Sequence, residues 1–220
     1  MKNPLIINFK NYEEISSVRA IRLGEAARLV AETLHVEIVL APPHPVLALI
    51  AKEVNLPIIC QHVDDKNTGP STGFFVPEMA KSYGATGSLI NHSEHRIEMN
   101  SIARLVERLR NLEMTSIVCA QEPKEVEEIS ALEPDFIAVE PPELIGSGRA
   151  VSKENPSVIT KSIEVAGSRS RIICGAGISS REDVSKAIEL GSHGILVASG
   201  VIKADSWEKK ITELASGMEL

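Results

Sequence analysis

Five segments of the chain that carry polar or small residues each follow directly on a short aliphatic run. The first is Asn8-Phe9-Lys10, the second runs from Asn91 to Glu94, and the third is Glu140. The last two contain only small residues, Gly175-Ala176-Gly177 and Ala198-Ser199-Gly200. Together these segments supply a carboxylate, an ammonium, an imidazole, an amide and two small-residue turns. Such a set suits acid–base chemistry on a small anionic compound.

The charged side chains indicate a reaction at a carbonyl group. Glu140 follows the apolar run FIAV, where a carboxylate is costly unless it is used or paired. We expect Glu140 to abstract a proton beside a carbonyl, His92 to donate a hydrogen bond to its oxygen, and Lys10 to place a positive charge near that oxygen. Taken singly, each residue has an ordinary alternative: a paired carboxylate, a capping or packing histidine, a solvated lysine.

The two small-residue turns predict a phosphate site. Backbone N–H groups of such turns at helix starts point at an anion, and the helix dipole adds attraction. They could be turns and nothing more, but after the last strands of a barrel phosphate binding is favoured. We therefore expect a phosphorylated carbonyl substrate. No metal or cofactor is expected, because the sequence has no HExxH pattern and no cluster of His and Cys.

Eight aliphatic runs, each followed by a helical pattern, must position these groups. This alternation predicts parallel strands with right-handed crossovers, and eight units favour a closed (β/α)8 barrel over the alternative, an open doubly wound sheet. The carboxyl ends of barrel strands share one rim, so the five segments would converge. We expect residues 1–220 to form a single barrel domain. The strands are predicted over residues 5–7, 37–41, 56–60, 88–90, 115–119, 136–139, 171–174 and 194–197, and the helices over about 17–33, 45–54, 77–83, 97–112, 123–131, 156–166, 180–190 and 206–214.

Composition excludes several classes of protein. Hydrophobic residues make up 43% and aromatics only 3% of the 220 residues, which suits a core of Ile, Val, Leu and Ala around a buried parallel sheet. The net charge of -7, without a basic cluster, argues against nucleic acid as a partner. No apolar stretch approaches the ~20 residues that span a membrane. The three cysteines form no CxxC pair, so we expect neither a zinc site nor disulfides. We expect them to be buried thiols, in a protein that resides in the cytoplasm.

Several of these segments resemble the triosephosphate isomerase family. The similarity lies in Asn8-Phe9-Lys10, in INHSEHR over residues 90–96, in AVEPPELIGSGR over residues 138–149 and in STGFFVPEMAKSYGAT over residues 71–86. The turns in GAGI and LVASG resemble the phosphate-binding turns of the family. These motifs occur in order over nearly the whole chain, and their combination is highly specific.

The resemblance implies the interconversion of dihydroxyacetone phosphate and glyceraldehyde 3-phosphate in glycolysis and gluconeogenesis. Glu140 matches the general base, His92 the electrophile that works as a neutral imidazole, and Lys10 the cation that stabilises the enediolate. Asn8 lies beside Lys10, and Glu94 matches the carboxylate that supports it.

The resemblance also implies phosphate contacts and a closing lid. Residues 141–149 match the mobile lid, in which Gly146 would offer its N–H to phosphate when the lid shuts. The implied phosphate-binding residues are Asn8, Lys10, Ile145, Gly146, Gly175, Ala176, Gly177, Ala198 and Ser199.

The sequence departs from the family pattern in and near the lid. Glu143 stands where many members carry Trp, Arg149 where many carry Lys, and Val139 where Tyr is common. The chain is also short between His92 and Glu140, which resembles the archaeal branch. We therefore expect a homo-oligomer, with a tetramer favoured and a dimer as the alternative. Two other functions stay open: a different isomerase or epimerase built on a phosphate-binding barrel, and a barrel that binds a sugar phosphate without catalysis.

Overall fold

Parallel strands occupy the centre of the structure, a computed structural model that describes residues 2–16, 18–144 and 150–218. Within these residues the sheet has eight strands in the order β2-β1-β8-β7-β6-β5-β4-β3. The strands are β1 (Leu5–Asn8), β2 (Ile38–Ala41), β3 (Ile59–Cys60), β4 (Gly87–Ile90), β5 (Thr115–Ala120), β6 (Phe136–Val139), β7 (Arg171–Cys174) and β8 (Ile195–Val197).

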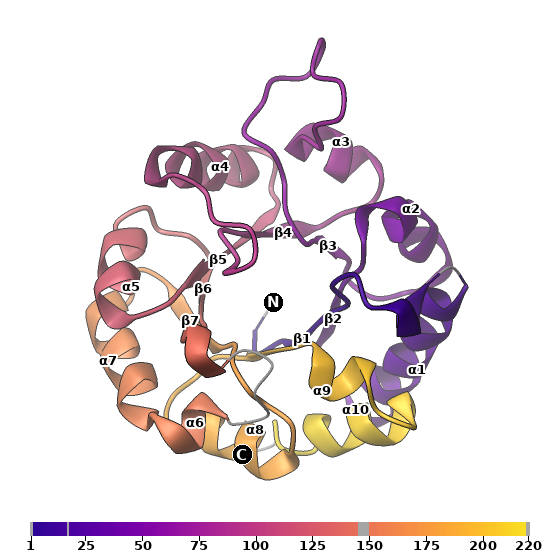
Figure 1. The fold of residues 1–220 in the computed structure, drawn as a ribbon, viewed down its shortest axis with the longest axis vertical. Coiled ribbons are helices and arrows are strands. Elements are labelled where there is room, and N and C mark those ends of the chain that lie inside the picture. Colours follow the sequence, from indigo (N-terminus) through magenta and orange to yellow (C-terminus); the bar gives the residue numbers. More distant parts are fainter. Residues whose placement is uncertain (1, 17, 145–149, 219–220) are drawn as a thin grey trace.

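The two end strands of this order meet and close the sheet. A parallel bridge pairs Leu40 of β2 with Ile58 just before β3, and the Leu40 N–H donates to the Pro57 carbonyl at 3.0 Å. Figure 1 shows the resulting ring of strands surrounded by helices. The predicted closed (β/α)8 barrel is confirmed, and the alternative of an open doubly wound sheet is wrong.

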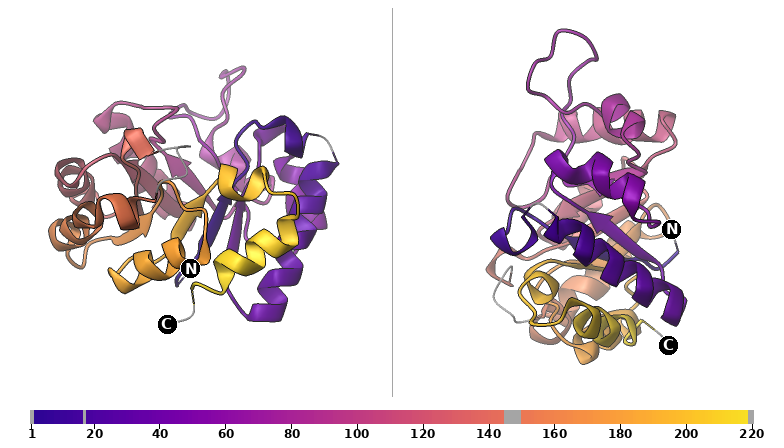
Figure 2. Two further views of the ribbon diagram at one scale, coloured as in Figure 1. Left: turned by 60° about the horizontal axis from the view of Figure 1, so that its bottom comes forward. Right: turned by 90° about the vertical axis from the view of Figure 1, so that its right-hand side faces the viewer.

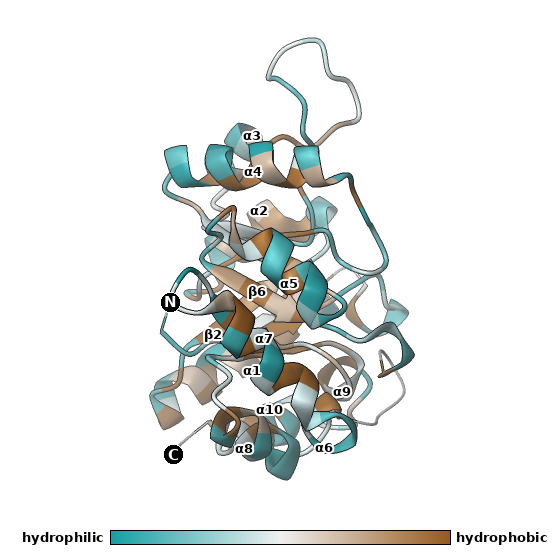
Figure 3. Cartoon of the chain, turned by 90° about the vertical axis from the view of Figure 1, so that its left-hand side faces the viewer, coloured by the Kyte–Doolittle hydropathy of each residue, from teal (hydrophilic) through white to brown (hydrophobic). Residues whose placement is uncertain are grey.

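Helices follow the strands and cover the outside of the barrel. Figure 3 shows hydrophobic residues on strands such as β6 and hydrophilic residues over much of the outer helices. In α4, the buried residues Ile102, Leu105, Val106 and Leu109 recur at helical spacing and face the sheet. The longer helices are α1 (Arg19–Leu34), α2 (His44–Glu53), α3 (Pro77–Ser82), α4 (Met99–Asn111), α5 (Pro123–Ser130), α7 (Pro156–Ala166), α8 (Arg181–Glu189) and α10 (Trp207–Ala215).

The strands divide the core into two clusters, because successive side chains of a strand point to opposite faces. In β1, Leu5 and Ile7 pack with the helices, whereas Ile6 belongs to a second cluster made only of strand residues. That second cluster fills the barrel, so the strands form a packed support for the rim rather than a pore. It comprises Ile6, Val39, Ala41, Ile59, Leu89, Ile117, Cys119, Phe136, Ala138, Ile173 and Leu196.

The structure differs from the sequence prediction at one strand and in short helices. β3 has two residues instead of the predicted five, since Pro57 has no N–H to pair within a sheet. Four short helices were not predicted, because they are too short to show a period: η1 (Glu13–Ile15), η2 (Pro142–Leu144), α6 (Val151–Glu154) and α9 (Ser199–Ile202).

A long loop between β3 and α3 projects away from the barrel (Figures 1 and 2). Its base is closed at Asp64 and Phe75: the Asp64 N–H donates to the Phe75 carbonyl at 2.9 Å, and the Phe75 N–H donates to Asp64 Oδ2 at 2.7 Å. Phe74, next to this closure, is 49% exposed. Among the helices of the described residues, none combines the length and the apolar character that crossing a bilayer demands.

Candidate active site

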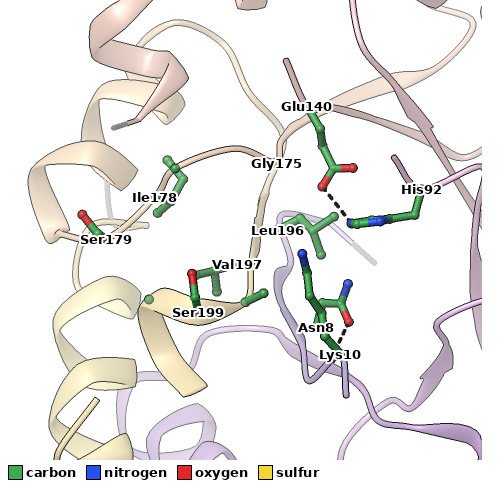
Figure 4. Close-up of a pocket in the computed structure, with 13 residues that line it drawn as sticks. Asn8, Lys10, His92, Glu140, Gly175, Ile178, Ser179, Leu196, Val197 and Ser199 are labelled. Atoms are coloured by element: carbon green, nitrogen blue, oxygen red, sulfur yellow. Dashed lines mark hydrogen bonds and ion pairs between the residues drawn. The ribbon is translucent and has the colours of Figure 1, made fainter. Parts of the chain in front are cut away.

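A pocket at the carboxyl end of the barrel brings together the five segments singled out in the sequence (Figure 4). Ile178, Ser179, Leu196, Val197 and Gly200 complete its lining, whereas Ala176 does not line it. Ile145 and Gly146 lie outside the described residues. The residues expected from the sequence that do line the pocket are Asn8, Lys10, His92, Glu140, Gly175, Gly177, Ala198 and Ser199.

Glu140 and His92 face each other across this pocket. His92 Nε2 lies 3.5 Å from Glu140 Oε1, and the two side chains are 8% and 3% exposed. The Glu140 N–H donates to the Ala120 carbonyl at 2.8 Å, which continues the pairing of β6 with β5 beyond Val139. Glu140 Oε2 is buried without a hydrogen-bond partner among the described residues. An unpartnered buried carboxylate oxygen is costly, so this atom is poised to accept a proton or a polar group from a bound ligand.

The hydrogen bonds of His92 define which ring nitrogen can donate. Its Nδ1 accepts a hydrogen bond from the Glu94 N–H at 3.2 Å. In a neutral imidazole one nitrogen accepts and the other carries the proton, so this bond places the proton on Nε2. Nε2 is the nitrogen that faces Glu140 and the pocket. His92 can therefore donate a hydrogen bond to a ligand without being charged.

Lys10 enters the pocket from a strained backbone. Its φ of 47° lies in the left-handed region, and its N–H donates to Asn8 Oδ1 at 2.9 Å. Its Nζ donates to Glu94 Oε1 at 2.7 Å, and the Lys10 side chain is only 15% exposed. Figure 4 shows the Lys10 side chain pointing into the space that His92 and Glu140 border. Glu94 thus fixes Lys10 through its side chain and His92 through its backbone.

Gln61 supports Lys10 and was not predicted from the sequence. Its Nε2 donates to the carbonyl of Lys10 at 3.1 Å and to the carbonyl of Ala41 at 3.0 Å. These bonds tie the left-handed turn at Lys10 to the end of β2. The available signal was position, because Gln61 directly follows β3 at the same rim as the other polar residues.

The small-residue turns leave room beside Glu140 and at the start of α9. A Cβ on Gly175 would lie 2.6 Å from Glu140 Cγ, and one on Gly200 would lie 2.7 Å from the Ile178 carbonyl oxygen. Gly177 has a φ of +72°, which favours glycine. Ser199 begins α9, and the first N–H groups of a helix have no partner within it. The turns therefore let a bound group approach the backbone of the pocket closely.

The described residues include no group of three or more His, Cys, Asp or Glu side chains that could hold a metal ion. What the pocket offers instead is a buried carboxylate at Glu140, a neutral hydrogen-bond donor at His92 and a cation at Lys10. The small-residue turns border the same pocket, with Gly175 beside Glu140 and Ser199 on the side away from His92 (Figure 4).

Comparison with known proteins identifies the family of this arrangement. The family model described as Triosephosphate isomerase matches residues 3–214. The chain belongs to the triosephosphate isomerase family. Proteins named triosephosphate isomerase from Cenarchaeum symbiosum and Methanothermus fervidus are 48% and 45% identical to it, covering 97% and 99% of this chain and 97% and 100% of their own lengths. One from Caldivirga maquilingensis is 44% identical over 98% of this chain and 97% of its own length.

Of residues 141–149, the segment expected to form a lid, the structure describes only residues 141–144. There, η2 begins after Pro141; Glu143 is exposed, whereas Leu144 and the preceding Val139 are buried. The rest of it, residues 145–149, lies outside the described residues. Beyond this segment, the Val151 N–H donates to the Ala176 carbonyl at 3.2 Å. The start of α6 is thus bonded to the turn that contains Gly175 and Gly177.

A buried cysteine, Cys119, lies beside Glu140 at the base of the site. Cys119 lies at the end of β5 inside the barrel cluster, next to the Glu140 side of the pocket. Burial, with a further contribution from the charge of Glu140, raises the pKa of the Cys119 thiol well above its usual value. The thiol therefore stays protonated and adds no second negative charge beside Glu140.

Proposed function

We propose that the chain is an aldose–ketose isomerase that interconverts dihydroxyacetone phosphate and D-glyceraldehyde 3-phosphate, as in glycolysis and gluconeogenesis. The observation that carries the proposal is the convergence of Glu140, His92 and Lys10 on one pocket, in a chain of the triosephosphate isomerase family. The same pocket has small-residue turns suited to a phosphate group.

The reaction would proceed by proton transfer through an enediolate. Glu140 removes a proton from the carbon beside the carbonyl and returns it to the neighbouring carbon. His92 donates its Nε2–H to the oxygen on which negative charge develops, and the ammonium of Lys10 stabilises that charge. Asn8 and Glu94 hold Lys10 in place. Because these side chains supply base, donor and cation, we expect no cofactor and no metal.

The phosphate group would bind on the side of the late strands. Gly175, Ala176 and Gly177 after β7, and Ala198 and Ser199 after β8, would surround it with small residues and backbone donors. We propose that Ile145 and Gly146 add contacts from the lid. Closure over the substrate would exclude water from the enediolate.

A steady-state assay with glyceraldehyde 3-phosphate tests the activity. We expect turnover by the pure protein and a loss of at least ~100-fold in kcat for Glu140→Ala, since a positioned base contributes ~100- to 10,000-fold. Glu189→Ala, which removes an exposed carboxylate on α8, is the matched control. Turnover of a different phosphorylated sugar would favour another isomerase, and tight binding of phosphoglycolate without turnover would favour a non-catalytic barrel.

We also propose that the chain folds as one barrel domain in the cytoplasm and associates with copies of itself. The projecting loop 64–75 and the exposed Phe74 support self-association, because such a loop offers contacts that a monomer leaves unused. We favour a tetramer over a dimer from the length of the chain. Light scattering coupled to gel filtration measures the assembly, and a monomer at micromolar concentration would contradict this proposal.

A further inference from the structure

We propose that Asn91 is a positioning residue for His92 and, through Glu94, for Lys10, and that Glu125 and Arg96 hold Asn91 in place. This inference rests on the proposed isomerase function. Asn91 is uncharged, and its side-chain hydrogen bonds go to Ile97, Cys119 and Glu125 rather than to the groups that would react. Its importance follows from where its backbone and its side chain lie.

The backbone of Asn91 sets the direction in which the chain leaves β4. Asn91 is fully buried and has a φ of 62°, in the left-handed region that few residues other than glycine adopt. His92 is the next residue, so the left-handed turn determines where the imidazole starts. A residue that favoured the ordinary right-handed region would direct His92 away from Glu140.

The side chain of Asn91 closes the segment that carries the reactive groups. Its Oδ1 accepts a hydrogen bond from the Ile97 N–H at 3.1 Å, just before α4. The two ends of segment 91–97 are thereby joined by a single side chain. Inside this closed segment lie His92 and Glu94, which are also bonded to each other. Asn91 therefore constrains both residues at once.

The amide nitrogen of Asn91 anchors the closed segment to the neighbouring strand and helix. Its Nδ2 donates to the Cys119 carbonyl at the end of β5 at 3.0 Å, and to Glu125 Oε1 on α5 at 3.4 Å. Both hydrogen-bonding atoms of this buried amide are thus used. A buried network in which every member is satisfied fixes one geometry, whereas a partly satisfied one does not.

Glu125 connects Asn91 to Arg96, near the other end of the same segment. Its side chain is 15% exposed and accepts hydrogen bonds from both Arg96 terminal nitrogens, in addition to the Gln121 N–H at 2.8 Å. Arg96 belongs to segment 91–97, so the ion pair fastens the segment to the first turn of α5. Two independent attachments, through Asn91 and through Arg96, meet on one carboxylate.

Two variants separate positioning from general stability. Asn91→Gly keeps the left-handed turn accessible and removes every side-chain bond. Glu125→Gln keeps the shape and removes the charge that holds Arg96. The control is Glu78→Gln, which breaks a comparable ion pair with Arg108 on α4, outside segment 91–97. Each variant is compared in kcat, KM and thermal unfolding, and by nitrogen NMR of labelled histidine, with His92 assigned by its loss in His92→Gln.

We expect Asn91→Gly to lower kcat by ~10- to 100-fold with little change in KM, because a misplacement of about 1 Å costs up to ~100-fold. The His92 nitrogens should lose the pattern of an acceptor Nδ1 and a protonated Nε2. Glu125→Gln should show a smaller loss in the same direction, and Glu78→Gln none. Unchanged kcat and His92 signals in Asn91→Gly would overturn the inference. So would losses in all three variants that follow thermal stability while the His92 signals stay the same. If the unmodified protein lacked isomerase activity, the proposed function would fail, but the NMR comparison would still test the positioning.

Discussion

Gly175 lies directly against the side chain of Glu140: a Cβ at Gly175 would stand 2.6 Å from Glu140 Cγ and 3.2 Å from its Oε1. No real Cβ comes so close, so an alanine at this position must displace the carboxylate or the strand end. The glycine that follows β7 therefore has a second effect besides the room that we propose it leaves for a phosphate group. It permits the side-chain position from which Glu140 faces His92.

Gly175→Ala should lower kcat by at least ~10-fold, since catalysis depends on the placement of the base to within about 1 Å. Isomerase kinetics on the folded variant measure this. Gly24→Ala in α1 is the control, because a Cβ there would also meet a close neighbour, Val54 Cγ2 at 2.8 Å, but far from the pocket. Equal kcat in Gly175→Ala and the unmodified protein would show that the carboxylate has room to shift without loss.

Lys10→Met should reduce kcat/KM by at least ~100-fold. The methionine has similar length but cannot stabilise the developing negative charge, and removal of one preorganised donor to such a charge costs ~100- to 1,000-fold. It also leaves Glu94 without its partner at 2.7 Å. Lys186→Met, which removes an exposed lysine paired with Glu189 on α8, serves as the control. A kcat/KM within twofold of the unmodified value in Lys10→Met would exclude the proposed role of the ammonium.

The architecture could be predicted from the sequence because local pattern and global fold agree. The helix predicted over residues 156–166 is α7, with the bounds that the structure gives, and the apolar run over residues 136–139 is β6. The prediction was wrong for most of the third strand, where Pro57 interrupts an otherwise apolar run. It also lacked α9, whose four residues are too few to display a helical period.

The residues of the candidate site could be predicted from the sequence, but the contacts that hold them in place could not. Convergence of Lys10, His92 and Glu140 follows from a closed barrel, since all three residues closely follow strands at one rim. By contrast, the left-handed backbone at Lys10 and the bonds from Gln61 depend on contacts between separate strands. Such contacts have no signature in a single sequence. The same is true of the bonds that Asn91 makes.

The histidines under the projecting loop should make the free energy of unfolding depend on pH. Burial, and next the charge of His95, lower the pKa of His62 to about 4 from 6.5, against the opposing effect of Asp64; His44 also faces this cluster. A group with a lowered pKa in the folded state prefers to be neutral there. Its contribution is therefore complete above pH 6.5 and is lost as the pH falls toward 4, because the unfolded chain takes up the proton first.

Urea unfolding between pH 7 and pH 4 measures this dependence. The free energy of unfolding should fall less steeply over that range in His62→Gln than in the unmodified protein. The exposed His35, replaced by Asn, which tolerates its left-handed φ of 54°, is the control and should leave the slope unchanged. Parallel curves for the unmodified protein and His62→Gln would rule out this histidine as the source.

The cysteines of the native protein should resist alkylation at pH 8. All three are buried, and burial raises the pKa of the Cys60 thiol and of the Cys174 thiol to about 12 and that of Cys119 well above its usual value. The thiolate is the nucleophile, so a raised pKa leaves almost none of it at pH 8. Mass spectrometry after a short exposure to iodoacetamide should find the native chain unlabelled, whereas protein unfolded in guanidinium should carry a label at each cysteine. Rapid labelling of Cys119 in the native state would mean that the base of the pocket opens to solvent, and would contradict a Cys119 thiol that stays protonated beside Glu140.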